Sequence, residues 1–492
     1  MKVQISYPPL PNSKGIPLLS QNRQFQWFTE GTYIYPMVPA SAATLLHQAG
    51  HDVVWDDAIA EERHYETWLG DLESHSPDVV MIETKTPVVK RHWKIINDVK
   101  GALPDVKIAL VGDHVTALPE ESMERSEVDY ILCGGDFDFL LLNLVQYLDG
   151  KCRKLEPGIW LRKHGVIKNT GPFQLKHRLD SLPFINRDLT RWKLYAYENG
   201  NYKRTPGTYT MVGRDCWYRR QGGCTFCSWP TLYPNFRARS PESLVDELDV
   251  LVTKYKVREV FDDTGTFPVG KWLRTFCGLM IERGLNDKIH FDCNMRFGAL
   301  NLEDYGLMKK AGFRMLLFGL ESGSQRILDE INKGVTTSDI VDSCKMASRA
   351  GLDVHVTVMF GYPTASRAEE QQTYRLASLL MNDGYAQTLQ STLLIAYPGS
   401  RLYETALSKG WLRYSPGEWE HWDMSEPMLK SSSMSPQEIK RLCDETYKLF
   451  ASPKYIIRRL VSVKSFEDLD FALRGIRKVI GHIRDFGGTG VY

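Results

Sequence analysis

The chain has 492 residues, of which 43% are hydrophobic and 25% are charged, and its formal net charge is +1. This length exceeds one ordinary hydrophobic core, and the composition predicts a soluble globular protein of two to four domains. A near-neutral charge without a long basic run excludes the usual signature of nucleic-acid binding.

The N-terminal sequence and the cysteines indicate the cellular setting. The chain does not begin with the charged and apolar regions of a signal peptide, and no run of about 18 apolar residues could form a transmembrane segment. Nine cysteines, an odd number, do not fit a secreted disulfide framework. We therefore expect a protein of the reducing cytoplasm.

Residues 1–150 alternate between short apolar runs and helical patterns. This alternation predicts a doubly wound, Rossmann-like parallel sheet, on which ligands bind at the carboxyl ends of the strands. No G-x-G-x-x-G follows the first strand, so a dinucleotide is not expected, and a generic nucleotide-type domain is the alternative on pattern alone. The expected strands are 3–6, 52–55, 78–82, 107–111 and 128–132, and the expected helices include 40–49 and 88–101.

Residues 151–205 form an expected linker. A small hairpin is predicted within 158–168, and prolines mark the segment that follows it. Lys, Arg and Tyr are dense over 191–204, which fits a solvated linker or, alternatively, one wall of a substrate site.

Residues 206–410 again alternate between strand and helix patterns. About six βα units predict a partial or full barrel, and polar residues gather just after each strand, where such barrels carry their catalytic groups. Residues 411–492 read as a helical C-terminal domain. The expected barrel strands end near 213, 261, 293, 320, 360 and 395, and the expected helices are 241–255, 271–284, 303–312, 337–351, 369–384, 435–450, 453–463 and 466–483.

Three cysteines, Cys216, Cys224 and Cys227, fall within twelve residues, which we call the cysteine loop (216–227). Three soft thiolates at one place suit an iron–sulfur cluster or zinc. A structural zinc site needs four ligands, and no further Cys or His lies within twenty residues of the loop. Three ligands instead leave one metal position open for chemistry.

Two sets of motifs resemble known protein families. Gly223–Cys227 with the following Ser-Trp-Pro, together with Gly319–Gly323, Lys333-Gly334 and Tyr397–Gly399, resembles radical S-adenosylmethionine (SAM) enzymes. Residues 49–57, 112–120, 128–130 and 134–136 resemble the cobalamin-binding domain that precedes many of those enzymes. The order of these domains along the chain is similar to that of the B12-dependent radical SAM family of the C-methyltransferase type.

The resemblance implies three cofactors: a 4Fe–4S cluster, SAM and cobalamin as methylcobalamin. Cys216, Cys224 and Cys227 would bind the cluster, although the family spacing is C-x3-C-x2-C and this chain has C-x7-C-x2-C. The seven-residue gap (217–223) is either an excursion or a contact with cobalamin or substrate. The implied SAM contacts are Phe226 near the adenine, Asp262, Asp263 and Thr264 at the amino group, Asn294 and Arg296 at the carboxylate or ribose, and Glu321 and Ser322 at the ribose.

Cobalamin would lie across the strand ends of the N-terminal domain. The D-x-H-x-x-G motif of cobalamin mutases is absent, so base-off cobalamin without that histidine is expected, and His114 is either a cobalt contact or a hydrogen-bonded loop residue. The implied contacts are Pro8, Pro9, Leu10, Thr84, Lys85, Thr86, Gly112, Asp113, His114, Val115, Thr116, Gly134, Gly135 and Asp136.

The implied activity is methylation of an unactivated sp3 carbon through a 5′-deoxyadenosyl radical and methylcobalamin. The resemblance leaves the substrate open. One alternative is methylation of a protein or peptide side chain, such as glutamine C-methylation in a methanogen protein. The other is cyclisation or rearrangement in the metabolism of a hopanoid-like lipid or a porphyrin. A non-catalytic cobalamin-binding regulator is a further alternative. The family also implies an electron donor such as ferredoxin or flavodoxin.

Overall fold

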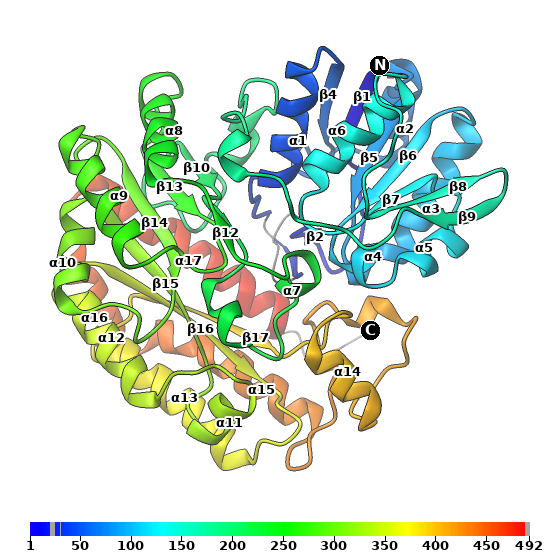
Figure 1. Cartoon of the computed structure of the whole chain (residues 1–492). Helices are drawn as coiled ribbons and strands as arrows, with labels where there is room; N and C mark the ends of the chain where they lie inside the picture. The colour runs from blue at the N-terminus through cyan, green and yellow to red at the C-terminus, as the bar shows by residue number, and fades with distance from the viewer. Residues whose placement is uncertain (20–24, 30, 488–492) are drawn as a thin grey trace.

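Two parallel sheets organise the molecule, one in an N-terminal domain and one in a central domain (Figure 1). The computed structural model describes residues 1–19, 25–29 and 31–487. Within these residues, no helix is both long enough and apolar enough to cross a membrane.

The N-terminal sheet has the order β4-β1-β5-β6-β7-β8-β9. Its first five strands are parallel, and the antiparallel hairpin β8–β9 extends the sheet into the expected linker. Strand β5 is buried along its whole length because helices cover both faces, which confirms the doubly wound sheet. The strands are β1 (Lys2–Tyr7), β4 (Asp52–Asp57), β5 (Val79–Glu83), β6 (Lys107–Val111), β7 (Tyr130–Leu132), β8 (Ile159–Lys163) and β9 (Val166–Asn169). The helices are α1 (Met37–Gln48), α2 (Tyr65–His75), η1 (Thr86–Val88), α3 (Val89–Ala102), α4 (Asp113–Ala117), α5 (Pro119–Arg125) and α6 (Phe137–Leu148).

The central sheet contains six parallel strands in chain order, β10-β13-β14-β15-β16-β17. Strands β10 and β17 are the two edges, so the sheet is a partial barrel with helices outside it, as the alternating pattern predicts. Side chains of Asn301, Thr336 and Ser366 cap three of those helices in capping boxes. The strands are β10 (Gly207–Thr210), β13 (Glu259–Asp262), β14 (His290–Met295), β15 (Phe313–Glu321), β16 (Asp353–Phe360) and β17 (Thr388–Leu393). The helices are α8 (Pro241–Thr253), α9 (Lys271–Glu282), α10 (Leu302–Lys310), α11 (Gln325–Glu330), α12 (Thr337–Arg349), α13 (Arg367–Asn382) and α14 (Arg401–Ser408).

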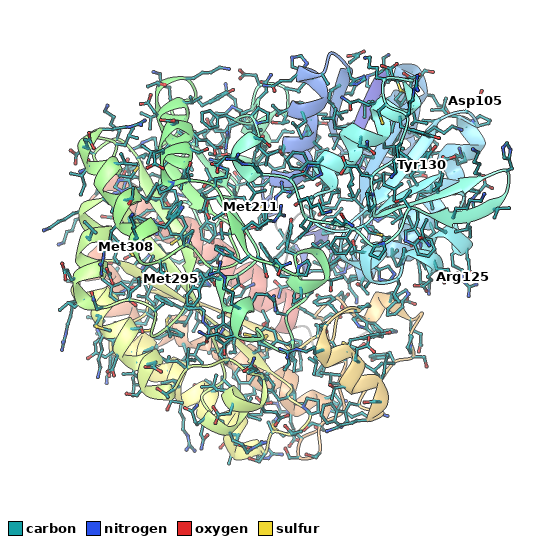
Figure 2. All side chains as sticks on the ribbon, viewed as in Figure 1. Asp105, Arg125, Tyr130, Met211, Met295 and Met308 are labelled. Atoms are coloured by element: carbon teal, nitrogen blue, oxygen red, sulfur yellow. The ribbon has the colours of Figure 1, made fainter. Side chains whose placement is uncertain are left out.

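Short elements lie where the two domains meet. The hairpin β11–β12 flanks the cysteine loop, and α7 follows the loop and contacts α4 of the N-terminal domain (Figure 1). Figure 2 labels Tyr130 in the N-terminal sheet and Met295 among the barrel strands. These elements are β2 (Ile16–Pro17), β3 (Trp27–Phe28), η2 (Leu179–Ser181), η3 (Trp192–Tyr195), β11 (Gly213–Arg214), η4 (Trp217–Gln221), α7 (Trp229–Leu232), β12 (Arg237–Ala238) and η5 (Trp419–His421).

The C-terminal segment is helical, as the sequence predicts. It consists of α15 (Pro436–Tyr447), η6 (Lys448–Ala451), α16 (Pro453–Ser462) and α17 (Phe466–Gly487). The first turns of helix α17 lie at the end of the barrel where strands begin, because Glu467 pairs with Arg204 at 3.1 Å and Arg474 donates to the carbonyl of Tyr202 at 3.0 Å. The helix also contacts β3.

Candidate cofactor and active site

The cysteine loop is anchored on both sides by backbone hydrogen bonds. The Thr225 amide donates to the Ile331 carbonyl at 3.0 Å, and the Thr225 carbonyl accepts from the Leu402 amide at 2.9 Å. The thiol of Cys216 lies 2.9 Å from the hydroxyl of Thr266, which follows β13. The loop is therefore fixed against the carboxyl ends of the barrel strands.

All three cysteines of the loop line one cavity of about 210 Å³. Burial raises the pKa of the Cys227 thiol to about 11 and also raises the pKa of Cys224. A free thiolate would therefore be costly at these positions, whereas metal ligation stabilises the anionic form. The positive groups of Lys333 and Arg296 lie near Cys224 and favour its thiolate.

This donor set fits an iron–sulfur cluster. Among the described residues, no three His, Cys, Asp or Glu side chains come close enough to hold one metal ion. Three thiols spread around one cavity, with cations beside them, are suitable ligands for an anionic cluster that leaves one iron position open. An iron position left open in this way would be available to a further ligand in the cavity.

Five of the expected SAM contacts line the same cavity as the cysteines. Asp263, Asn294, Arg296 and Glu321 follow or end successive strands β13, β14 and β15, and Phe226 comes from the cysteine loop. Parallel strands bring their carboxyl ends to one edge, which explains why strand-end residues as far apart as Asp263 and Glu321 meet here. Arg296 is held over the ring of Tyr218, 3.6 Å from the centroid, and donates to the Lys333 carbonyl.

The other three expected SAM contacts do not line the cavity. Asp262 accepts from the Thr210 hydroxyl at 2.8 Å and from the Val212 amide at 2.9 Å, and it binds the Thr264 amide at 3.1 Å. The Thr264 hydroxyl accepts from the Gly213 amide at 2.8 Å. Ser322 accepts from the Ser324 amide at 3.1 Å. These side chains hold the strand ends in place.

Several cavity residues were missed by the sequence reasoning. Lys333, which belongs to the Lys333-Gly334 motif, lines the cavity and forms an ion pair with Glu321 at 2.8 Å. Thr357 and Met359 on β16, with Gln390 and Thr392 on β17, also line the cavity. The two residues of each pair are two positions apart. Because successive side chains of a strand point to opposite faces, this alternation could have predicted which side chains point into the cavity.

The strand-end loops of the N-terminal domain are covered by other parts of the chain. His114 is fully buried, with Nδ1 3.2 Å from the Thr86 hydroxyl and Nε2 3.3 Å from Glu121, and the ring of Trp419 packs against it at 5.0 Å. Both ring nitrogens therefore have partners within the protein. Lys85 and Asp113 form a buried pair at 3.4 Å beside it.

Two of the glycines expected to contact cobalamin are required by close packing. A side chain at Gly112 would meet the Thr84 carbonyl at 2.2 Å, and one at Gly135 would meet the Tyr233 ring at 1.8 Å. The next residue, Asp136, pairs with Arg214 of β11 at 2.6 Å. The loop 134–136 thus joins the two domains. Pro8, Pro9 and Leu10 follow β1 and are buried, as are Thr84, Thr86, Val115 and Gly134, whereas Thr116 is half-buried.

The domain junction still offers hydrogen-bonding capacity suited to cobalamin. The buried Thr231 hydroxyl on α7 has no partner among the described residues, and it lies beside Gly399 and Ala117, which come from the barrel and the N-terminal domain. The corrin ring carries amide side chains that such a hydroxyl can bind. One buried hydroxyl at the junction is therefore available to such an amide.

Comparison with known families identifies both domains. Residues 31–137 match the B12 binding domain, and residues 211–377 match the radical SAM superfamily. The chain is a cobalamin-dependent radical SAM enzyme. Its cofactors are therefore a 4Fe–4S cluster, SAM and cobalamin, which confirms the expected set.

Relatives of this enzyme support the same order of domains. An uncharacterised methyltransferase of Pyrococcus horikoshii is 27% identical over 91% of this chain and 95% of its own length. The anaerobic magnesium-protoporphyrin IX monomethyl ester cyclase of Cereibacter sphaeroides is 25% identical over 68% of this chain and 54% of its own length. The enzyme falls with the methyltransferase class.

The fold of the enzyme is that of a solved relative. The radical SAM methyltransferase TsrM from Kitasatospora setae, solved with cobalamin and a 4Fe–4S cluster, superimposes with a TM-score of 0.67 at 15% identity. The superposition covers 99% of this chain and 100% of that one. The match extends over both domains and the C-terminal helices, so the whole architecture is shared.

Proposed function

We propose that the enzyme methylates an unactivated sp3 carbon. When bound, the reduced cluster and SAM supply a 5′-deoxyadenosyl radical that removes a hydrogen atom, and methylcobalamin supplies the methyl group. The observation that carries the proposal is the shared cavity, which joins the three cysteines, the strand-end polar groups and the barrel interior. The chain's contribution is to position these groups and exclude water.

Each polar group at the strand ends has a role in this proposal. Asp263, which lines the cavity, is our candidate for binding the ammonium group of SAM, because a carboxylate is the natural partner of an ammonium donor. Arg296, fixed by Tyr218, is suited to the SAM carboxylate. Glu321, oriented by Lys333, is suited to the ribose hydroxyls.

The substrate side of the cavity favours an uncharged group. Thr357, Gln390 and Thr392 offer neutral hydrogen-bonding groups, and Met359 and Leu394 add apolar surface. A primary amide on a short aliphatic chain matches this lining, because the amide can pair with Gln390 while the methylenes contact the apolar residues. These features support a protein or peptide side chain, such as glutamine, as the substrate.

A second candidate is cyclisation or rearrangement of a porphyrin or lipid. The observation that favours it is the likeness to the protoporphyrin ester cyclase, which spans 68% of this chain. A third reading, a cobalamin-binding regulator without turnover, would leave the three cysteines of the cavity without a catalytic purpose.

The experiment is anaerobic reconstitution followed by product analysis. We expect bound iron, sulfide and cobalt, and turnover with reduced ferredoxin or flavodoxin that releases 5′-deoxyadenosine and S-adenosylhomocysteine. Deoxyadenosine alone would favour cyclisation or rearrangement, and neither product would favour the regulator. Failure to bind cobalamin after reconstitution would contradict the proposal.

A further inference from the structure

The seven-residue gap after Cys216 is an ordered part of the site. Residues Trp217–Gln221 form the short helix η4, and Gly222 and Gly223 then adopt positive φ angles of 90° and 64°. The indole of Trp217 donates to the Phe267 carbonyl at 3.2 Å. Asn332 donates to the Gly223 carbonyl at 2.8 Å. The gap is therefore fixed to the barrel at both ends.

Arg219 is the residue that this gap directs toward the cysteines. Its guanidinium binds both carboxylate oxygens of Asp215, at 2.9 and 3.0 Å, and Asp215 is fully buried. The Nη2 atom also lies 3.9 Å from the sulfur of Cys227, within the range of an N–H···S contact. The neighbouring Arg220 is exposed.

The local backbone leaves space for this guanidinium. A side chain at Gly223 would meet Nη1 of Arg219 at 2.1 Å, so the glycine permits the close approach. Asp215 itself has a φ of 78° and packs against Gly265, where a side chain would meet its carbonyl at 2.7 Å. Two glycines and one unusual backbone conformation thus hold the Asp215–Arg219 pair in one orientation.

The pair presents its positive end to the sulfur. The Nε and Nη2 groups of the guanidinium donate to the two oxygens of Asp215, and Nη2 also contacts the sulfur of Cys227. Hydrogen bonds to cluster sulfurs and nearby positive charge stabilise the reduced form, which carries one more negative charge, and so raise the reduction potential. A planar, permanently charged guanidinium serves this role better than a lysine ammonium.

We infer that Arg219, supplied by the seven-residue gap, is a positioning residue that sets the reduction potential of the cluster through Cys227. In that reduction one electron enters the cluster from an external low-potential donor, and no bond to Arg219 forms or breaks. The inference rests on the proposed ligation of the cluster by Cys216, Cys224 and Cys227.

The test is the midpoint potential of the reconstituted cluster, followed by electron paramagnetic resonance during a titration with dithionite. We expect Arg219→Gln to shift the potential to a more negative value, Arg219→Lys to shift it less, and the matched control Arg220→Gln to leave it unchanged. Iron and sulfide contents are measured on every sample, so that failed ligation is distinguished from a failed inference.

Each result decides the question. An Arg219→Gln protein with a full cluster and the wild-type potential would overturn the inference. If that variant does not hold a cluster, Arg219→Lys becomes the deciding variant, and a full cluster with a shifted potential supports the role. A folded protein that loses the cluster with both substitutions would make Arg219 a structural element only. Iron retained by Cys224→Ala would instead reject the ligation itself.

Discussion

At the scale of single residues, Cys224 is the most informative position, because it lies beside both Lys333 and Arg296 in the cavity. We expect Cys224→Ala to abolish iron binding and the release of 5′-deoxyadenosine, since two thiolates cannot replace three ligands of the cluster. The measurement is iron content together with product analysis by mass spectrometry. Cys152→Ala, which removes a cysteine outside the cavity, should retain both.

Adjacent carboxylates at the end of β13 have different tasks. Asp263 lines the cavity, whereas Asp262 is buried among its hydrogen-bond donors. We expect Asp263→Asn to weaken SAM binding about tenfold, which corresponds to about 1.4 kcal/mol, because a charged hydrogen bond is lost. Isothermal titration calorimetry measures this change.

The matched variant at the neighbouring position should behave differently. Asp262→Asn places an amide against two N–H groups and a hydroxyl, so we expect it to lower stability by about 1–3 kcal/mol. Equal loss of SAM affinity in both variants, at unchanged stability, would contradict this division of roles.

At the scale of elements, helix α13 meets the end of β16 through a buried carboxylate. Glu370 accepts from the amides of Gly361 and Tyr362 at 2.9 and 3.1 Å, and burial raises its pKa from 4.5 to about 7. Protonated Glu370 therefore favours folding below pH 4.5, and this contribution is lost as the pH rises through about 7.

This carboxylate gives a stability change with a defined direction. We expect the free energy of unfolding of the native protein, taken relative to that of Glu370→Gln, to fall by up to about 3 kcal/mol between pH 4.5 and 7. The reason is that the glutamate carboxyl ionises over this range whereas the glutamine amide does not. Urea unfolding at several pH values measures it. Glu369→Gln, next to it, should show the opposite trend, because Arg326 lowers the pKa of Glu369 and its contribution is lost on acidification.

Much of the element pattern could be predicted from the sequence. The run 107–111 coincides with β6, and the other expected strands overlap the observed ones, because strands covered on both faces are marked by continuous apolar runs. The cysteine loop was equally visible from its spacing. The hairpin β8–β9 was expected, but its pairing with β7 was not, since an edge position is decided by tertiary contacts.

The site was only partly predictable for the same reason. Residues that follow strands were found, but the separation of Asp263 from Asp262 depends on the direction of each side chain. The pairing of Arg219 with Cys227 depends on the path of the seven-residue gap. Neither fact is encoded in residue type or spacing alone.

At the scale of the whole molecule, a buried ion-pair network joins the two domains. Arg214 of β11 binds Asp136 at 2.6 Å and Asp138 at 2.5 Å, and Arg237 of β12 binds the same Asp136. Arg214, Asp136 and Asp138 are almost fully buried. The strands that flank the cysteine loop are thus fastened to the N-terminal domain.

Removing the central arginine should damage both domains together. We expect Arg214→Gln to lower stability by about 3–5 kcal/mol, because it leaves the buried Asp138 without its ion-pair partner and Asp136 with Arg237 alone, and to reduce the cobalamin retained after reconstitution. Thermal unfolding and cobalt content are the measurements. The exposed pair of Arg283 with Asp246 provides the control, since Arg283→Gln should cost less than about 1 kcal/mol.

The same network has a consequence for the order in which the chain matures on the ribosome. Asp136 and Asp138 are synthesised 78 and 76 residues before Arg214. The N-terminal domain therefore emerges with two acids that have no counter-ion until the first barrel strand and the hairpin behind it leave the exit tunnel. Although domains generally fold in order during synthesis, these two acids can complete their ion pairs only after the hairpin has emerged.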